Sequence, residues 1–309
     1  MTTAFLFPGQ ASQLVGMGKD LSEAYPVARQ LYEEADDTIG FSLSTICFDG
    51  PMEELSKTSV TQPAVFLHSV VCARLLSEQG VEPSVVAGHS LGEYSALVAA
   101  GVLDFGAALQ LVHRRGELMQ AAGSQRPGAM AAILGVDDEQ IVGLCEADEG
   151  VVVAANFNAP GQIVISGEAD AVARVGVAAN EAGAKRVVDL LVSGAFHSAL
   201  MVPAADELAT QLQQASFSAP RALVVTNVSA TAETDPQRLQ QLLIEQMTAP
   251  VRWTDSVKAV VGTGVTGAYE VGPGAVLKGL VRRIDRALEV RSMGTAQELA
   301  ELGPEVTGA

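Results

Sequence analysis

Short runs of apolar, often β-branched residues alternate along the chain with longer segments in which apolar residues recur every three or four positions. The short runs predict buried strands, and the longer segments predict amphipathic helices. The expected strands cover residues 3–7, 84–88, 222–226 and 267–271. The expected helices cover residues 18–38, 61–78, 93–100, 237–247 and 275–284, and a further helix follows Asp104. Strands that alternate with helices in this way indicate an α/β fold.

The rhythm changes between residues 128 and 193. Predicted strands at 129–134, 151–156, 162–166 and 185–192 enclose predicted helices at 137–146 and 168–182. This order is β-α-β-β-α-β, which is that of the ferredoxin-like split unit. We therefore expect a small inserted domain, residues 128–193, within a larger domain formed by residues 1–127 and 194–309.

Composition and charge exclude several classes of protein. With 48% hydrophobic residues and 30 glycines among 309 residues, the chain is typical of a globular protein and not of a disordered one. The net charge of −17 argues against a nucleic-acid partner, because phosphate binding requires clustered Lys and Arg. The N-terminus has no basic leader, and no apolar run reaches the roughly 18 residues that a membrane span needs. We therefore expect neither a signal peptide nor a membrane-spanning segment.

The cysteines show no spacing that is typical of a disulfide framework or a metal site. Cys47, Cys72 and Cys145 lie far apart and in no CxxC pattern. His68 and Cys72 share one face of a predicted helix, but the sequence places no further ligands nearby. These features predict a cytoplasmic protein without a bound metal.

The pentapeptide Gly88-His89-Ser90-Leu91-Gly92 lies between a predicted strand and a predicted helix. In this context Gly-x-Ser-x-Gly presents the serine hydroxyl on a tight turn, where it can act as a nucleophile. The first N–H groups of the helix point toward any oxyanion that develops there. The alternative interpretation is a glycine-rich turn with an incidental capping serine.

A nucleophilic serine needs a base, and His197 is the leading candidate. Of the four histidines, it alone lies in a predicted loop outside the serine turn. On the helix that follows Asp104, Arg114 is predicted to face water and Arg115 to lie at the edge of the apolar stripe. The alternative for Arg115 is an exposed head group whose stem covers apolar surface.

Several segments, in the same order along the chain, resemble malonyl-CoA:acyl carrier protein transacylases and the acyltransferase domains of polyketide synthases. The resemblance runs from about residue 3 to about residue 290. It implies an α/β-hydrolase-like large domain with a parallel sheet, a ferredoxin-like small domain, and an active site between them. The matching segments are Phe7-Pro8-Gly9-Gln10, Gly88 to Ala96, Arg115, Asn156 to Gln162, Gly194 to Ser198 and Glu270 to Gly274.

The resemblance also implies a reaction and the residues that carry it. A malonyl group would pass from malonyl-CoA to the phosphopantetheine thiol of acyl carrier protein through a malonyl-serine ester, on a monomer without cofactor or metal. One departure is Ala11, where the family often has glycine. The implied site consists of Ser90 as nucleophile, His197 as base, the backbone N–H groups of Gln10 and Leu91 for the oxyanion, Arg115 for the malonyl carboxylate, a backbone carbonyl near Gln246 that orients the histidine, and Phe196 beside the acyl group.

Two other functional classes fit parts of the pattern. A serine esterase or thioesterase on an α/β-hydrolase fold needs an acid between Ser90 and His197, and Asp189 is the candidate. A non-catalytic module that binds a carrier protein is the second, although it has no need of both Ser90 and His197. A thioester assay with and without carrier protein separates transfer from hydrolysis.

Basic residues are scarce, so their clusters predict where an acidic carrier protein docks. The chain has 19 Lys and Arg against 36 Asp and Glu. Residues four apart on a helix share a face, so the basic side chains of the predicted helix at 275–284 can form one surface. The alternative is an ordinary solvated helix face. The candidates are Lys278, Arg282, Arg283 and Arg286 on and just after this helix, together with Lys185 and Arg186 at the start of the last small-domain strand.

Overall fold

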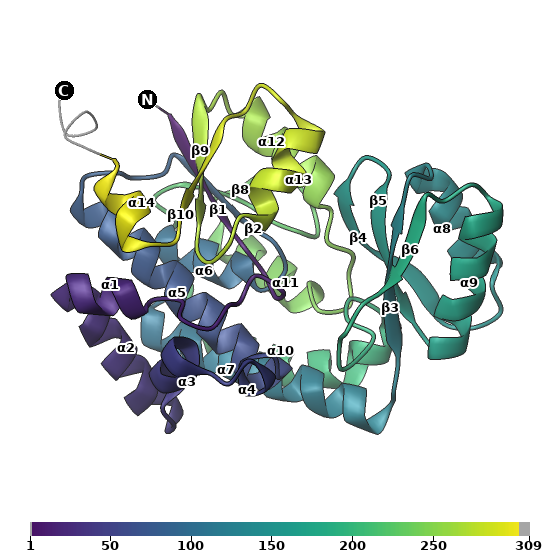
Figure 1. Cartoon of the computed structure of the whole chain (residues 1–309), viewed down its shortest axis with the longest axis horizontal. Helices are drawn as coiled ribbons and strands as arrows, with labels where there is room; N and C mark the ends of the chain where they lie inside the picture. Colours follow the sequence, from purple (N-terminus) through teal and green to yellow (C-terminus); the bar gives the residue numbers. More distant parts are fainter. Residues whose placement is uncertain (1, 303–309) are drawn as a thin grey trace.

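The computed structural model describes residues 2–302, and within this range the strands form two separate sheets (Figure 1). Neighbouring strands of the larger sheet run parallel, except that β8 is antiparallel to β7. The larger sheet has the order β10 (Val290–Met293), β9 (Gly267–Val271), β1 (Thr3–Phe7), β2 (Val85–Gly88), β7 (Leu223–Val225) and β8 (Ala232–Glu233). The smaller, antiparallel sheet has the order β4 (Val152–Ala159), β5 (Gln162–Gly167), β3 (Ala129–Leu134) and β6 (Arg186–Asp189). The fold is therefore of the mixed α/β kind that the sequence predicts.

Alternation along β1 divides the core of the larger sheet into two clusters. Phe5 and Phe7 face helices α5 (Thr58–Glu78) and α6 (Gly92–Ala99), whereas Ala4 and Leu6 face α12 (Trp253–Gly262) and α13 (Val276–Ile284). Successive side chains of a strand point to opposite faces, so a strand covered on both faces is apolar at every position. The continuous apolar run of residues 4–7 follows from this double coverage.

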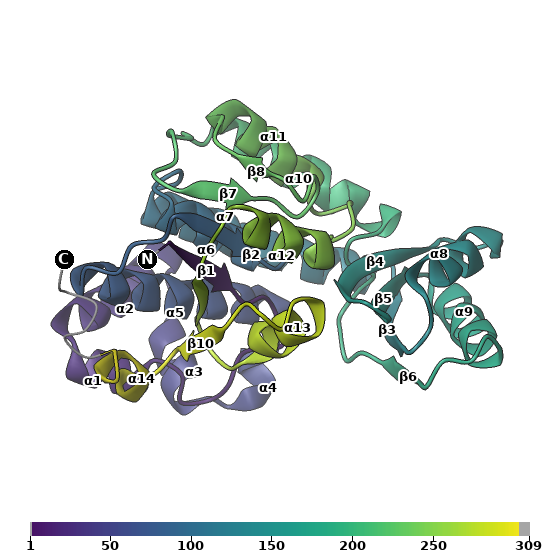
Figure 2. The same ribbon diagram turned by 90° about the horizontal axis from the view of Figure 1, so that it is seen from above.

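The remaining helices surround these layers. Figure 2 shows the small sheet at one end of the molecule, with α12 and α13 beside β4. Helices α8 (Asp138–Ala147) and α9 (Ala169–Glu181) pack on the small sheet. The others are α1 (Lys19–Ala24), α2 (Pro26–Ile39), α3 (Leu43–Asp49), α4 (Met52–Leu55), α7 (Phe105–Gln125), a 3₁₀ turn at Ala199–Met201, α10 (Val202–Gln214), α11 (Pro236–Glu245) and α14 (Ala296–Ala300).

The parallel pairing of β1 with β2 brings two functional loops together. Phe7 lies opposite Gly88 in the register, so both strands end at the same edge of the sheet. The His89 N–H donates to the Phe7 carbonyl at 3.0 Å. The loop that begins at Pro8 therefore lies beside the turn that carries Ser90.

Helix α5 is long and apolar enough to cross a membrane, which the sequence interpretation did not anticipate. However, 83% of its most apolar 18-residue window is buried inside the protein. The helix packs against α6 and α7, and its side chains from Ala64 to Leu67 are fully buried. Its apolar character is explained by its central place in the core.

Several predicted boundaries are wrong. The helix expected at 18–38 is two helices, because Tyr25 adopts an extended conformation before Pro26. Helix α5 begins at Thr58, so Thr61 is not its N-cap and instead donates through its hydroxyl to the Leu55 carbonyl. The strand expected at 185–192 covers only Arg186–Asp189. The sequence interpretation did not identify three elements of the carboxyl-terminal part, namely α12, β10 and α14.

A backbone connection joins the small sheet to the larger body. The Phe157 N–H of β4 donates to the Val251 carbonyl at 2.9 Å, and the Val251 N–H donates to the Ala155 carbonyl at 2.8 Å. The Thr254 hydroxyl donates to the Phe157 carbonyl at 3.1 Å. The segment before α12 is thus tied directly to β4.

Candidate active site

Ser90 lies on the turn between β2 and α6, with a φ of 52°. This left-handed conformation is uncommon for a residue other than glycine. The two motif glycines permit the turn: a Cβ on Gly88 would lie 1.9 Å from the Gly92 carbonyl carbon, and a Cβ on Gly92 would lie 2.1 Å from the Phe7 carbonyl oxygen. The two glycines therefore allow close backbone contacts that a residue with a Cβ would block.

His197 is buried next to the serine. Its Nε2 lies 2.8 Å from Ser90 Oγ, and its Nδ1 lies 3.0 Å from the Gln246 carbonyl and 3.1 Å from the Ala249 carbonyl. Because a carbonyl oxygen can only accept, Nδ1 carries the proton and Nε2 is left to accept from the serine hydroxyl. Burial, and then the charge of Arg115, lower the pKa of His197 to about 3. The imidazole is therefore neutral near pH 7.

Arg115, on α7, also contacts the Ser90 hydroxyl. Its side chain is fully enclosed, with the residue 1% exposed, so the alternative of an exposed head group does not hold. Nη2 donates to Ser90 Oγ at 3.1 Å and to Gln246 Oε1 at 3.1 Å. Nη1 donates to Gln62 Oε1 at 2.7 Å. These neutral acceptors leave a buried positive charge directly beside the serine oxygen.

The neighbouring Arg114 points away from the site, as the helical period predicts. Its side chain is 37% exposed and forms ion pairs with Glu117 and Glu207. These two carboxylates raise the pKa of Arg114. Of two adjacent arginines on one helix, therefore, only Arg115 contacts the serine.

The backbone N–H groups of Gln10 and Leu91 come from the two adjoining loops. Among residues 2–302, neither N–H donates a hydrogen bond. By contrast, the Ser90 N–H donates to Asn227 Oδ1 at 2.7 Å. Ala11 has a φ of 77°, a conformation that favours glycine, which explains why glycine suits this position.

Phe196 and Asp189 lie in different settings. Phe196, which precedes the histidine, is 5% exposed and belongs to the main core cluster. Asp189 is exposed on β6, at the edge of the small sheet. The Nδ1 of His197 contacts two backbone carbonyls and not this carboxylate. The arrangement therefore lacks the acid contact that an Asp189-based triad requires.

Residues 4–308 match the family model of the acyl transferase domain. The chain belongs to the acyl transferase family. It is 48% identical over 300 residues to the malonyl CoA-acyl carrier protein transacylase of Escherichia coli K12, covering 96% of this chain and 97% of that one. It is 46% identical over 289 residues to the Bacillus subtilis protein of that name, covering 93% of this chain and 91% of the relative. The family resemblance inferred from the sequence motifs is thus confirmed.

Solved structures show the same relationship. The chain superposes on an acyl carrier protein S-malonyltransferase from Vibrio cholerae with a TM-score of 0.94 and 48% identity, covering 98% of this chain and 100% of the other. It also superposes on a malonyl-transacylase solved in complex with its type II polyketide synthase acyl-carrier protein, with a TM-score of 0.93 and 46% identity. That comparison covers 97% of this chain and 98% of the other.

The acyl transferase site contains three buried polar residues whose contacts the sequence interpretation missed. Glu93 Oε2 accepts from the Asn227 N–H and from Gln246 Nε2, each at 3.0 Å, and Gln62 holds Arg115. Burial raises the pKa of the Glu93 carboxyl to about 7. Glu93 belongs to the matching motif, and Asn227 follows β7 at the same sheet edge as Ser90. Polar residues at strand ends were therefore a usable signal for Asn227.

The basic residues of the acyl transferase do not form one uniform cluster. Lys278, Arg282, Arg283 and Arg286 are exposed and line a groove of about 810 Å³. Arg283 also joins α13 to the turn between β4 and β5, because its guanidinium donates to Gln162 Oε1 and to the Pro160 carbonyl. Lys185 and Arg186 are exposed at the start of β6. The Lys185 N–H donates to the Leu134 carbonyl, and Leu134 lies opposite Gln162, the residue that Arg283 contacts. Both basic groups therefore lie at the same end of the small sheet.

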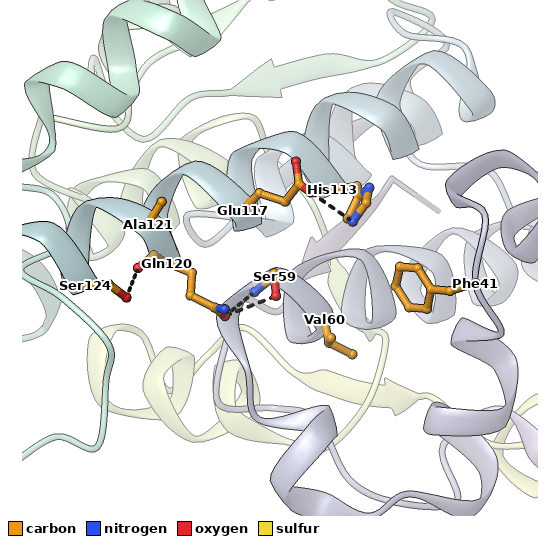
Figure 3. A pocket seen from close by; sticks show the side chains of 8 residues that line it. All are labelled: Phe41, Ser59, Val60, His113, Glu117, Gln120, Ala121 and Ser124. Carbon is orange, nitrogen blue, oxygen red and sulfur yellow. Dashed lines mark hydrogen bonds and ion pairs between the residues drawn. The ribbon is translucent and has the colours of Figure 1, made fainter.

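Another pocket of the acyl transferase, of about 340 Å³, lies on a different face of α7 (Figure 3). His113 and Glu117 line it together with Gln120, whose Oε1 accepts from Ser59. At roughly 100° per residue, these positions point away from Arg115. Neither Ser90 nor His197 lines this pocket, so it is separate from the candidate active site.

The histidines and cysteines do not gather into a metal site. Within residues 2–302, no group of three or more His, Cys, Asp or Glu side chains is arranged to hold a metal ion. Both ring nitrogens of His68 have polar partners, Nδ1 at 3.2 Å from the Tyr32 hydroxyl and Nε2 at 3.0 Å from the Gly294 carbonyl. His68 therefore links the core helix α5 to α2 and to the segment after β10.

Proposed function

We propose that this acyltransferase moves the malonyl group from malonyl-CoA to the phosphopantetheine thiol of an acyl carrier protein, through a malonyl ester on Ser90. The observation that carries the proposal is the convergence of His197 Nε2 and Arg115 Nη2 on Ser90 Oγ, at 2.8 and 3.1 Å. One group can take the serine proton, and the other can bind a carboxylate. The malonyl CoA-acyl carrier protein transacylases to which the chain is similar support the same activity.

In the first half-reaction, His197 Nε2 takes the proton of the Ser90 hydroxyl as Oγ attacks the thioester carbon. The tetrahedral oxyanion accepts from the N–H groups of Gln10 and Leu91. The C–S bond then breaks, and the departing CoA sulfur receives the proton from Nε2. The products are CoA and malonyl-Ser90, and His197 is neutral again.

In the second half-reaction, the carrier thiol gives its proton to His197 Nε2 and its sulfur attacks the serine ester. The C–O bond breaks, and Ser90 Oγ recovers the proton. Charge and atoms balance at each step, because an ester replaces one thioester and a second thioester replaces the ester. These steps use only side chains and backbone N–H groups of the protein, so we propose that no cofactor takes part.

Arg115 and Phe196 would select the acyl group. A guanidinium can bind a carboxylate through two parallel N–H bonds, and such a pair is strongest where water is excluded. Arg115 is buried and its Nε has no hydrogen-bond partner among residues 2–302. The Phe196 ring beside the histidine would exclude an α-methyl branch. Together they favour malonyl over acetyl and over methylmalonyl groups.

The exposed basic groove is proposed as the docking surface for the carrier protein. Acyl carrier proteins are acidic and the chain itself carries a net charge of −17, so docking needs a local positive surface. Lys278, Arg282 and Arg286 supply it, with Lys185 and Arg186 nearby. Arg283 contributes less, because its hydrogen bonds to the 160–162 turn hold it against the small sheet.

The finer description of the fold is part of the proposal. The β3-α8-β4-β5-α9-β6 order and the antiparallel sheet support a ferredoxin-like small domain at residues 128–193. The mainly parallel sheet and the Ser90 turn support an α/β-hydrolase-like domain at residues 1–127 and 194–309. We propose that the protein acts as a cytoplasmic monomer.

Intact-protein mass spectrometry after incubation with malonyl-CoA tests the proposal. The wild type is expected to gain one malonyl group on the peptide that holds Ser90, and Ser90→Ala is expected to gain none. His197→Ala should acylate more slowly by about 10²–10⁴-fold, the usual value of general-base assistance. Ser95→Ala, another buried serine on α6, is the matched control and should acylate normally.

The second arm adds carrier protein to the isolated malonyl-enzyme. Transfer predicts that the malonyl mass appears on the carrier, whereas a thioesterase would release free malonate at the same rate with or without carrier. A label found on Cys72 or another residue would overturn the mechanism. The absence of any acylated serine would favour a non-catalytic binding module.

A further inference from the structure

Both backbone polar groups of Ser90 are bound by side-chain amides from distant parts of the chain. Its N–H donates to Asn227 Oδ1 at 2.7 Å, and its carbonyl accepts from Gln246 Nε2 at 2.9 Å. Asn227 Nδ2 also donates to the Gly88 carbonyl at 2.6 Å, so this one amide binds the turn at two points. A left-handed serine persists only where its surroundings hold it in place.

Glu93 joins the two amide residues. Its Oε2 accepts from the Asn227 N–H and from Gln246 Nε2, each at 3.0 Å. Glu93, Asn227 and Gln246 are each 1% exposed and come from α6, the loop after β7 and the end of α11. A buried carboxylate with two donors on one oxygen therefore fixes three separate elements around the serine turn.

We propose that Glu93 and Asn227 are positioning residues for Ser90. They hold its left-handed backbone so that Oγ remains in contact with His197 and the neighbouring Leu91 N–H faces the reacting carbonyl. Neither residue touches the reacting atoms, and the inference rests on the proposed role of Ser90 as nucleophile. Because Asn227 engages the Ser90 N–H, that donor is withheld from the oxyanion.

The two residues act on different parts of the site. The side-chain amide of Asn227 binds the serine turn alone. By contrast, the amide of Gln246, which donates to Glu93, also accepts from Arg115 Nη2 at 3.1 Å. Loss of Glu93 therefore removes one of the two acceptors of the Gln246 amide and leaves the Ser90 carbonyl to hold the group that orients the carboxylate-binding guanidinium. Loss of Asn227 should slow attack on every acyl group equally, and loss of Glu93 should slow attack on malonyl more than on acetyl groups.

Single-turnover acylation by malonyl-CoA and by acetyl-CoA tests this inference. Asn227→Ala should lower both rate constants by the same factor, about 10–100-fold, because small errors of placement carry costs of that order. Glu93→Ala should lower the malonyl rate constant by a larger factor than the acetyl one. Glu93→Gln should keep most of the wild-type rate, since its amide oxygen can accept both donors. Among residues 2–302, the other oxygen, Oε1, has no hydrogen bond to lose.

Rate constants separate positioning from folding. A variant that merely unfolds in part loses the amplitude of acyl-enzyme formation, while its folded molecules react at the wild-type rate. Ser95→Ala is the matched control, because Ser95 lies on the same helix as Glu93 and is also buried. The inference would be overturned if Asn227→Ala reacted with wild-type rate constants, or if Glu93→Gln reacted as slowly as Glu93→Ala. Equal losses of the malonyl and acetyl rate constants in Glu93→Ala would also overturn it. A wild type that forms no acyl-serine would instead refute the proposed function.

Discussion

The Ser90 site and the groove along α13 both present arginines, but in opposite surroundings. Arg115 is buried with neutral acceptors around it, whereas Arg282 and Arg286 are exposed to solvent. A buried charge interacts strongly with a partner that enters beside it, while exposed charges are screened by water and salt. The buried arginine should therefore decide which acyl group reacts, and the exposed ones should affect how fast a partner arrives.

The sharpest test of this contrast is Arg115→Ala. Removing one partner of a desolvated ion pair costs about 2–5 kcal/mol, so malonyl transfer should fall by orders of magnitude. Acetyl transfer, which has no carboxylate to bind, should fall little or rise. Steady-state assays with the two thioesters measure the difference, and Arg114→Ala is the adjacent control that should behave as wild type. Equal losses for both acyl groups in Arg115→Ala would contradict the assigned role.

The pH dependence of acylation tests how the buried charge of Arg115 affects the pKa of the base, His197. His197 can accept the serine proton only when neutral, so acylation should fall on acidification through its pKa. Since burial and Arg115 lower that pKa to about 3, the rate should stay level well below pH 6.5. In Arg115→Ala the acidic limb should move to higher pH, measured with acetyl-CoA. A wild-type inflection near pH 6.5 would show that the histidine is not buried as described.

Phe196→Ser should produce a smaller change, confined to the size of the acyl group. One methyl group is worth about 1–3 kcal/mol of discrimination in an apolar pocket. The variant should therefore accept methylmalonyl-CoA more readily than the wild type without coming to prefer it. Competition between malonyl-CoA and methylmalonyl-CoA gives the ratio directly. Equal use of both substrates by the wild type would remove the basis for this prediction.

The smallest effect is expected at the exposed groove. The double variant Arg282→Glu and Arg286→Glu should slow transfer to carrier protein, while malonyl-Ser90 formation stays near normal, because exposed charges act mainly on association rates. Added salt should slow the wild type more than the variant. Arg29→Glu with Arg74→Glu changes the net charge equally at a distant surface and serves as control. Damage to both half-reactions would mean that the helix is structural or binds the CoA phosphates.

The sequence predicts those parts of the site that depend on local context. Ser90 is recognisable because a strand, two close-packed glycines and a helix surround it, and Arg115 because the helical period separates it from Arg114. Glu93 and Asn227 gain their contacts across 134 positions of the chain, and no local pattern reports such a pairing. The serine and the arginine were therefore accessible to sequence reasoning. For Asn227 the strand end indicates a place near the site, but its contact with Glu93 was not predictable.

The same distinction applies to the fold. The alternation in residues 129–189 predicts the small antiparallel sheet, because each of its helices and strands has its own period. Boundaries were less accessible: Pro26 begins a second helix where apolar periodicity continues, and the helix expected to start at Thr61 starts a turn earlier at Thr58. At Pro26 the restriction that proline places on Tyr25 outweighs the apolar periodicity. At Thr58, which is buried, the core environment extends the helix beyond the predicted cap.

The hydrogen bond from Arg115 to Ser90 Oγ has a consequence for thioesters that lack a carboxylate. With it in place, a lone pair of the attacking oxygen is engaged by a cation, which makes the oxygen a poorer nucleophile. On the proposed role of Arg115, a malonyl group would draw the guanidinium to its own carboxylate and release that lone pair, whereas an acetyl group would leave it engaged. The site would then discriminate between malonyl and acetyl thioesters in the rate of bond formation as well as in binding. An abundant acetyl thioester that occupied the site would therefore react slowly.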